Sequence, residues 1–216
     1  MERLTGPAGP RSRPLTGRRL GLFGGTFDPP HNGHLTLARA ARAQLRLDQV
    51  LWLVTADPPH KQGQVLTPVA VRLEMVTAMI AAEPAFALSR VDVDRPGPHW
   101  AADSVALLAR QYPGDQLLYL MGGDSLRDLP RWGRPQALLA NCRLGVLRRP
   151  GAVIDLASLE RALPGITDKV EFVDVPPLDV ASHIIRQRVR SGEPIGGLVP
   201  DAVAQLIARQ RLYQTG

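Results

Sequence analysis

Short apolar runs alternate with stretches of helical periodicity along most of the chain. Apolar runs of about four to eight residues are typical of buried strands, whereas apolar positions three or four apart indicate one face of a helix. The predicted strands cover 20–23, 50–54, 86–91, 116–121, 143–147 and 170–173. The predicted helices cover 33–47, 68–82, 101–111, 155–163, 182–190 and 200–209. This alternation predicts an α/β fold with a doubly wound, Rossmann-like parallel sheet and helices on both faces.

The length and composition narrow the class of protein. The chain has 216 residues, of which 44% are hydrophobic and 21% charged, and domains usually contain about 100 to 200 residues. We find no repeat, no long linker and no second core, so we expect a single domain over residues 19–216. Every apolar run falls short of the roughly 18 residues of a membrane span. The sequence therefore argues against a disordered or membrane-spanning chain.

The positive charge is concentrated at the start of the chain. The formal net charge is +6, and residues 1–19 contribute +4 of it through five arginines and one glutamate. This segment is rich in proline and glycine and lacks the apolar core of a secretory signal. Such a composition buries too little apolar surface to fold, so we expect residues 1–18 to form a flexible basic tail.

Cysteine usage bears on the compartment. Cys142 is the one cysteine, so the chain can form neither an internal disulfide nor a multi-thiolate zinc site. A reducing compartment is consistent with this, and we expect a cytoplasmic protein.

The loop after the first strand carries the clearest chemistry. Gly24 and Gly25 allow close backbone approach, and the following helix presents free N–H groups to an anion. His31 and His34 are three residues apart, so both rings can face one phosphate-sized space. Neither G-x-G-x-x-G nor the Walker A motif occurs. Nucleotide binding of another kind is predicted.

Each histidine also has a structural interpretation. One of them could cap the helix or pack in the core, and an isolated histidine is more often structural. A zinc pair is the rival functional hypothesis, but zinc needs at least a third ligand.

Further candidates stand at strand ends and helix starts. Lys61 follows a Pro-Pro turn and could meet phosphate, although exposed loop lysines are common. Asp124 could accept hydrogen bonds from ribose hydroxyls or serve as a helix N-cap. Trp132 could stack on a pyridine or purine ring or pack in the core.

A late helix offers a second possible phosphate site. Ser182, His183 and Arg186 open it, so a hydroxyl, N–H groups and a guanidinium could hold phosphate oxygens. An ordinary amphipathic helix with a solvated arginine face is the alternative.

The segment Gly-Gly-Thr-Phe-Asp-Pro-Pro-His-Asn-Gly-His over 24–34 resembles the signature of the nucleotidyltransferase superfamily with its H-x-G-H element. Within it, the chain is most similar to bacterial nicotinate-nucleotide adenylyltransferases. Further segments carry the resemblance: Asp57-Pro-Pro-His-Lys61, Arg72-Leu-Glu-Met75, Gly122-Gly-Asp-Ser125 with Trp132, and Val180-Ala-Ser-His-Ile-Ile-Arg186. It spans residues from about 19 to the C-terminus.

The resemblance implies an enzyme that transfers AMP from ATP to nicotinate mononucleotide and releases pyrophosphate, with Mg²⁺ arriving on ATP. It implies catalytic roles for His31, His34, Lys61 and Arg186. The ATP-binding residues that it implies are Gly24, Gly25, Thr26, Phe27, Gly33, Gly122, Asp124, Ser182 and His183. The substrate-binding residues that it implies are His99, Trp100 and Trp132.

Two segments depart from the family pattern. Ala181-Ser182-His183 stands where the family usually has Ser-Ser-Thr, so His183 matches only as a replacement phosphate donor. His99, Trp100 and Ala101 replace Ser, Tyr and Thr in a stretch that helps the family recognise the pyridine carboxylate. A preference for nicotinamide mononucleotide therefore stays open as an alternative.

Other acceptor substrates, and a protein of a different functional class, also remain as alternatives. Phosphopantetheine or a cytidylyl acceptor would be alternatives within the superfamily. The rival from a different class is a basic nucleic-acid-binding module with a vestigial nucleotide site. We expect ATP and nicotinate mononucleotide as partners, with no nucleic acid and no membrane, and the oligomeric state is open.

Overall fold

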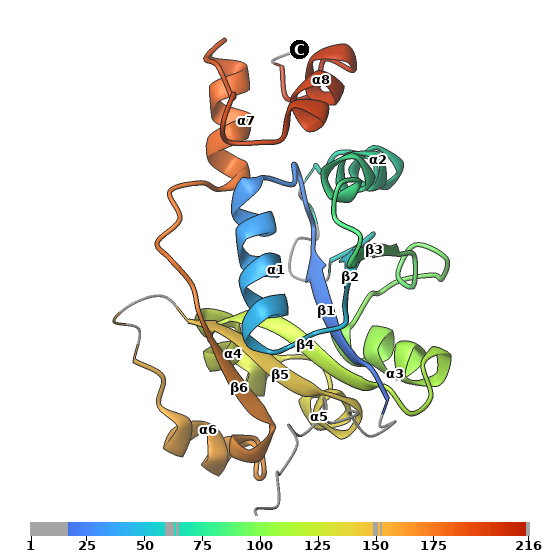
Figure 1. The fold of residues 1–216 in the computed structure, drawn as a ribbon, viewed down its shortest axis with the longest axis vertical. Coiled ribbons are helices and arrows are strands. Elements are labelled where there is room, and N and C mark those ends of the chain that lie inside the picture. The colour runs from blue at the N-terminus through green and yellow to red at the C-terminus, as the bar shows by residue number, and fades with distance from the viewer. Residues whose placement is uncertain (1–16, 59–62, 64, 149–150, 152, 215–216) are drawn as a thin grey trace, which may run out of the picture.

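Six parallel strands form one sheet at the centre of the structure (Figure 1). The computed structural model describes residues 17–58, 63, 65–148, 151 and 153–214. The strand order is β3-β2-β1-β4-β5-β6, and every neighbouring pair is parallel. The strands are β1 Arg19–Gly25, β2 Gln49–Val54, β3 Phe86–Ser89, β4 Gln116–Gly122, β5 Arg143–Arg148 and β6 Val170–Asp174.

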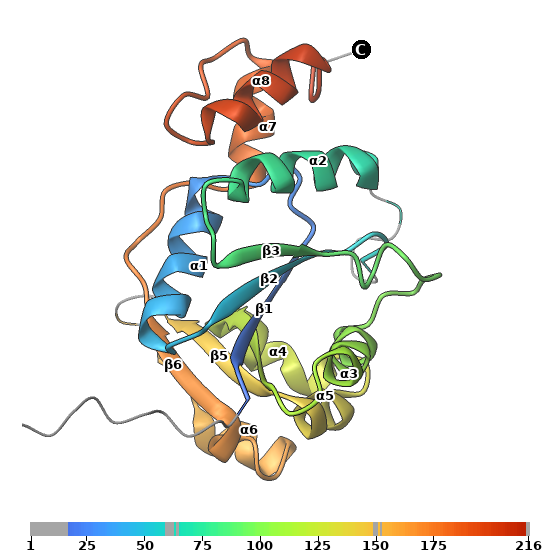
Figure 2. The ribbon, with the colours of Figure 1, turned by 45° about the vertical axis from the view of Figure 1, so that its right-hand side comes forward.

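Helices connect the strands and cover both faces of the sheet (Figure 2). The α-helices are α1 Asn32–Gln44, α2 Val69–Ile80, α3 Ala101–Gln111, α4 Gly123–Asp128, α5 Pro135–Asn141, α6 Leu156–Ala162, α7 Ser182–Arg190 and α8 Asp201–Arg209. Two short 3₁₀ turns, η2 Leu129–Arg131 and η3 Thr167–Lys169, complete the described elements. The predicted doubly wound α/β fold is confirmed.

Each face of the sheet has its own hydrophobic core. The described residues form two hydrophobic clusters. One lies under α1, α2, α7 and α8, and the other lies under α3, α4, α5 and α6 on the opposite face of the sheet. In β2, Val50, Trp52 and Val54 face the first core, whereas Leu51 and Leu53 face the second. All five are buried, which explains why this strand reads as a continuous apolar run. Each such side chain contributes roughly 1.5–3 kcal/mol to folding.

The strand order places a ligand crevice between β1 and β4. The chain adds strands on one side of β1 up to β3 and then returns to add β4 on the other side. Helices therefore diverge at the carboxyl ends of β1 and β4, and ligands of open α/β sheets bind at this switch point. The loops after these two strands are the ones that the sequence singled out.

Several element boundaries differ from the predicted ones. The strand predicted to reach Val91 ends at Ser89, because the N–H groups of Val93 and Asp94 turn back to the carbonyl of Arg90 at 2.8 and 2.9 Å. Helix α1 ends at Gln44, and Arg46 adopts a left-handed φ of 52°. The pattern also missed α4 and α5, which have six and seven residues.

The start of the described chain is held at the sheet. Residues 1–16 of the predicted tail lie outside the described residues. Arg18 donates to Asp115 through its backbone N–H at 2.8 Å and through its guanidinium at 2.7 and 3.0 Å. Among the helices that the structure describes, none is long and apolar enough to cross a membrane.

Candidate active site

The first loop joins the end of β1 to α1 and brings the two predicted histidines together. His31 is the N-cap of α1, and its backbone N–H donates to Nδ1 of His34 at 3.1 Å. Because Nδ1 of His34 is an acceptor, the neutral ring carries its proton on Nε2. The two imidazoles are stacked, with ring centroids 3.7 Å apart. The pair therefore presents a defined N–H donor at the crevice.

Burial keeps both imidazoles neutral. His31 is 7% exposed, and burial lowers its pKa from 6.5 to about 4. The pKa of His34 is also lowered well below its usual value, first by burial and second by the neighbouring His31. Phe27 and Phe23 contact the ring of His34 edge-on, at 5.0 and 6.1 Å between centroids. At pH 7 the histidine pair thus offers neutral hydrogen-bonding groups rather than cations.

Phe27 of the first loop and Gly33 of the first turn of α1 pack closely around the histidine pair. Phe27 has a left-handed φ of 51°, and its side chain is buried against Trp52 and His34. Gly33 is a close-approach position, because a Cβ there would lie 2.8 Å from Val180 Cγ1 and 3.0 Å from His31 Nδ1. Glycine at 33 therefore lets the chain before α7 pack on the histidine pair.

Arg72 of α2 fastens the first loop to the end of β2. Its guanidinium is buried and donates to the carbonyl of Thr26 in the first loop, to those of Thr55 and Ala56 after β2, and to that of Thr67 before α2, at 2.8–3.1 Å. Burial is also the main cause that lowers the pKa of Arg72. Arg72 was identified in the sequence as part of a motif, but its role in joining the first loop to the end of β2 was not predicted.

A cavity of about 370 Å³ lies at the carboxyl ends of β1 and β4. Predicted ATP-binding residues Gly24, Gly25, Thr26 and Gly122 line it, together with His34. A second cavity, of about 590 Å³, adjoins it. The two share six lining residues: Gly24, Thr55, Pro58, Tyr119, Ser125 and Trp132. They form one groove across the switch point.

The second cavity has aromatic walls. Trp100 and Trp132 line it, and Trp132 meets Tyr119 edge-on at 6.2 Å between centroids. A Cβ on Gly133 would lie 2.5 Å from the Trp100 ring, so Gly133 lets that indole lie flat on the backbone. Tyr119 also lines the groove and was not predicted. It lies in the apolar run of β4, and nothing in that run indicates that its side chain faces the groove.

His99 lines the same cavity, but backbone groups engage both of its ring nitrogens. Nδ1 accepts from the N–H of Asp57 at 3.1 Å, and Nε2 lies 3.2 Å from the carbonyl of Arg95. The ring thus ties the chain after β2 to the chain before α3. Its assignment to substrate stays a prediction.

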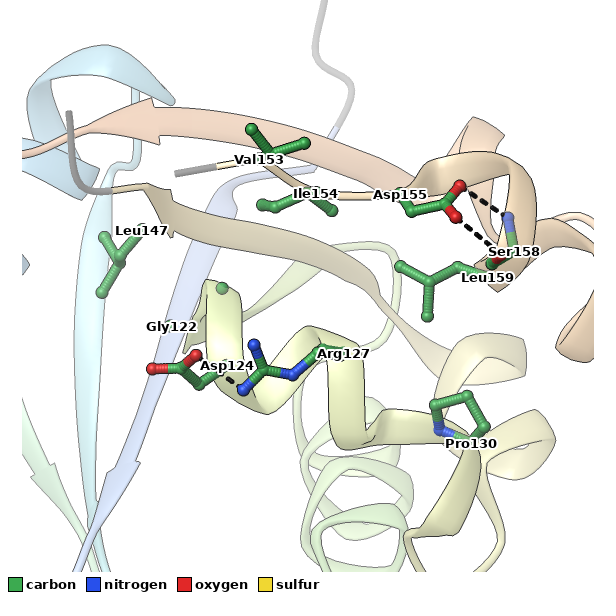
Figure 3. Close-up of a pocket in the computed structure, with 11 residues that line it drawn as sticks. Gly122, Asp124, Arg127, Pro130, Leu147, Val153, Ile154, Asp155, Ser158 and Leu159 are labelled. Atoms are coloured by element: carbon green, nitrogen blue, oxygen red, sulfur yellow. Dashed lines mark hydrogen bonds and ion pairs between the residues drawn. The ribbon is translucent and has the colours of Figure 1, made fainter. Parts of the chain in front are cut away.

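A third cavity, of about 720 Å³, continues from the first, with which it shares Gly122 and Leu147. Figure 3 shows Asp124 and Arg127 of α4 on one side and Asp155 and Ser158 at the start of α6 on another. Asp124 and Arg127 form an exposed ion pair at 2.8 Å. Gly122 is the N-cap of α4, and Asp124 lies in its first turn. The N-cap alternative for Asp124 is therefore wrong, and its carboxylate remains open to the cavity.

Helix α7 docks on the first loop through two of its predicted site residues. Ser182 donates from Oγ to the carbonyl of Pro29 at 2.9 Å, and Arg186 donates from Nη1 to the carbonyl of Asp28 at 2.7 Å. His183, between them in sequence, is exposed. The structure thus places Ser182 and Arg186 beside the histidine pair's loop.

One predicted catalytic residue, Lys61, lies outside the described residues. Within the described part of the chain, no group of three or more His, Cys, Asp and Glu side chains is placed to hold a metal ion. Cys142 is buried, and burial raises the pKa of its thiol to about 12.

Known proteins resemble this chain over most of its length. Residues 22–188 match the cytidylyltransferase-like family. A probable nicotinate-nucleotide adenylyltransferase from Thermomicrobium roseum is 46% identical over 197 residues, which cover 91% of this chain and 92% of the relative. The nicotinate-nucleotide adenylyltransferase of Bacillus subtilis is 37% identical over 198 residues, which cover 92% of this chain and 100% of the relative.

A solved structure shares the fold. The nicotinic acid mononucleotide adenylyltransferase of Plasmodium falciparum, complexed with NaAD, superposes with a TM-score of 0.72 at 17% identity, over 91% of this chain and 97% of that one. The sheet order, the histidine pair at the switch point and the family match define a cytidylyltransferase-like nucleotidyltransferase fold. Within this class, the chain belongs to the nicotinate-nucleotide adenylyltransferase family, which confirms the resemblance that the motifs carried.

Proposed function

We propose that this protein transfers AMP from Mg²⁺-ATP to nicotinate mononucleotide, which yields nicotinate adenine dinucleotide and pyrophosphate. The observation that carries the proposal is the row of three adjoining cavities along the switch point, with His34 at the middle one and two tryptophans at one end. Such a row suits two nucleotides that meet at their phosphates. The names of the relatives support the same reaction.

Adenylyl transfer requires the protein mainly to position the two substrates and to stabilise negative charge on their phosphates. A phosphate oxygen of the mononucleotide attacks the α-phosphorus of ATP, and the bond from that phosphorus to the bridging oxygen breaks. The electron pair leaves with pyrophosphate. The attacking phosphate is already ionised at pH 7, so no general base is needed. The protein contributes in-line positioning and stabilisation of charge at the α-phosphate and the leaving group.

We assign the residue roles from the positions of the described side chains and, for Lys61, from the family resemblance alone. The Nε2–H of His34 donates to an α-phosphate oxygen, and the stacked His31 holds the ring in place. Arg186 and Lys61 attend the triphosphate. Asp124 accepts from ribose hydroxyls of ATP in the third cavity. A neutral imidazole suits this task, because it donates to phosphate without a permanent charge that burial would destabilise.

The acceptor's ring lies between Trp100 and Trp132 in the second cavity. Ala101 begins α3 and lines this cavity, so N–H groups at the very start of this helix can receive a carboxylate. The negative charge of Asp92, which also lines the cavity, is balanced by Arg95 at 2.9 Å. These contacts favour the acid over the amide, despite the departures at residues 99–101.

A competition assay tests the substrate. The protein is incubated with Mg²⁺-ATP and equal concentrations of nicotinate and nicotinamide mononucleotides, and the two dinucleotide products are separated and quantified. We expect the acid product to predominate. Predominance of the amide product would contradict the substrate assignment and leave the reaction class intact.

A further inference from the structure

The carboxylate of Asp28 joins the catalytic loop to two other parts of the chain. Asp28 lies three residues before His31 and is 5% exposed. Its Oδ1 accepts the hydroxyl of Tyr213 at 2.6 Å, and its Oδ2 accepts the N–H of Thr67 at 3.2 Å. The carbonyl of the same residue accepts from Arg186. One buried residue is thus held from the C-terminal segment, from the chain before α2, and from α7.

The turn after α8 carries the C-terminal segment back to this loop. Arg211 and Tyr213 adopt left-handed φ values of 50° and 61°, and the N–H of Leu212 bonds to the carbonyl of Ile207 at 3.0 Å. Residues other than glycine adopt this conformation at a cost, so other contacts must hold it. The hydrogen bond from the Tyr213 hydroxyl to the buried carboxylate of Asp28 can offset this cost, because hydrogen bonds to charged groups are stronger than those between neutral groups.

Other contacts from the C-terminal region reach the opposite end of the same loop. The side chain of Asn32 donates to the carbonyl of Gly197 at 2.8 Å, and its backbone N–H donates to that of Leu198 at 2.9 Å. Ser182 holds Pro29. The C-terminal region therefore holds the loop before and after His31. Figure 1 shows α7 and α8 together above the start of α1.

We propose that Tyr213 is a positioning residue for the reaction, which acts by holding Asp28 so that His31 and His34 keep their stacked, hydrogen-bonded geometry. Between Asp28 and His31 stand only Pro29 and Pro30, which lack N–H groups and resist rotation. A displacement of Asp28 therefore passes directly to the N-cap of α1. The backbone N–H of His31 in turn fixes the proton of His34 on Nε2.

Substitution Tyr213→Phe tests this role, because it removes the hydroxyl and keeps the ring. For the kinetic readout, which rests on the proposed function, we expect kcat to fall about tenfold, with smaller changes in KM for either substrate, because a misplaced donor costs mainly transition-state stabilisation. The second readout needs no substrate. Long-range ¹⁵N–¹H NMR should show the Nε2–H form of His34 in the wild type and a mixture of tautomers in the variant.

Glu74→Gln is the matched control. Glu74 accepts from Arg209 at 2.9 Å and from Gln210 at 2.7 Å, so it also holds the end of α8 to the body, but on the surface and away from the loop. We expect this variant to lose little stability, since exposed ion pairs contribute little, and to keep kcat within about twofold of the wild type.

The outcomes separate the two proposals. A folded Tyr213→Phe protein with kcat and His34 tautomer like the wild type would overturn the positioning role. Should that variant be too unstable to assay, Asp28→Ala, which removes the acceptor of the Tyr213 hydroxyl, is expected to change the same two readouts, and its failure to do so would overturn the role equally. A wild-type protein without transfer activity would contradict the proposed function, whereas the His34 spectrum would still test the positioning.

Discussion

The buried, neutral state of His31 makes folding stability depend on pH. The pKa of His31 falls from 6.5 to about 4 on folding, because the ring is buried. Between these values the unfolded chain binds more protons than the folded one, so stability falls as the pH drops. At about 1.4 kcal/mol per pKa unit, the loss between pH 7 and pH 4 amounts to about 3 kcal/mol. Total stabilities of domains are about 5–15 kcal/mol.

The variant His31→Gln isolates this effect. Free energies of unfolding come from urea denaturation of both proteins at a series of pH values from about 7 to 4, without substrates. Lost packing shifts the variant equally at every pH. Burial, the main cause that lowers the pKa of His34, acts in both proteins, so the His34 contribution cancels in the difference apart from the part that His31 itself causes. We expect the wild type to lose about 3 kcal/mol more than the variant over the series. A difference that stays constant within about 0.5 kcal/mol would refute the assignment of a buried, neutral His31.

Three further variants test separate parts of the site. His34→Ala should lower kcat by about 10²–10³ with a smaller effect on KM, and steady-state turnover near the wild-type value would remove this imidazole from the chemistry. Arg72→Met leaves four backbone carbonyls without their donor, so urea denaturation should show a loss of at least about 3 kcal/mol; a loss below about 1 kcal/mol would mean that water replaces the guanidinium. Trp132→Leu should raise the KM of the mononucleotide about tenfold and leave that of ATP unchanged, and equal changes in both would argue against stacking on the pyridine.

The strands and the longer helices were predictable because burial leaves a regular pattern of apolar residues in each of them. The apolar run in β2 and the amphipathic periods of the longer helices each identify their element. Helices α4 and α5 were not predicted, since each is less than two turns long and shows no full apolar period. Helix α4 matters to the proposed site, because it places Asp124 at the third cavity.

The candidate site was predictable where its residues are contiguous. The first loop carries glycines and both histidines within eleven residues, so local spacing was enough. The roles of Arg72 and Tyr213 depend on partners up to 46 and 185 residues away. Neither side chain stands out in its own segment, and only the folded structure shows that both converge on the first loop.

The central claim is most directly tested by the stoichiometry of one reaction. The protein is incubated with Mg²⁺-ATP and nicotinate mononucleotide, and the dinucleotide and pyrophosphate are quantified over time. We predict that both products accumulate in equal amounts and that neither forms when the mononucleotide is omitted. Pyrophosphate released without dinucleotide, or no turnover at all, would contradict adenylyl transfer as the function of this site.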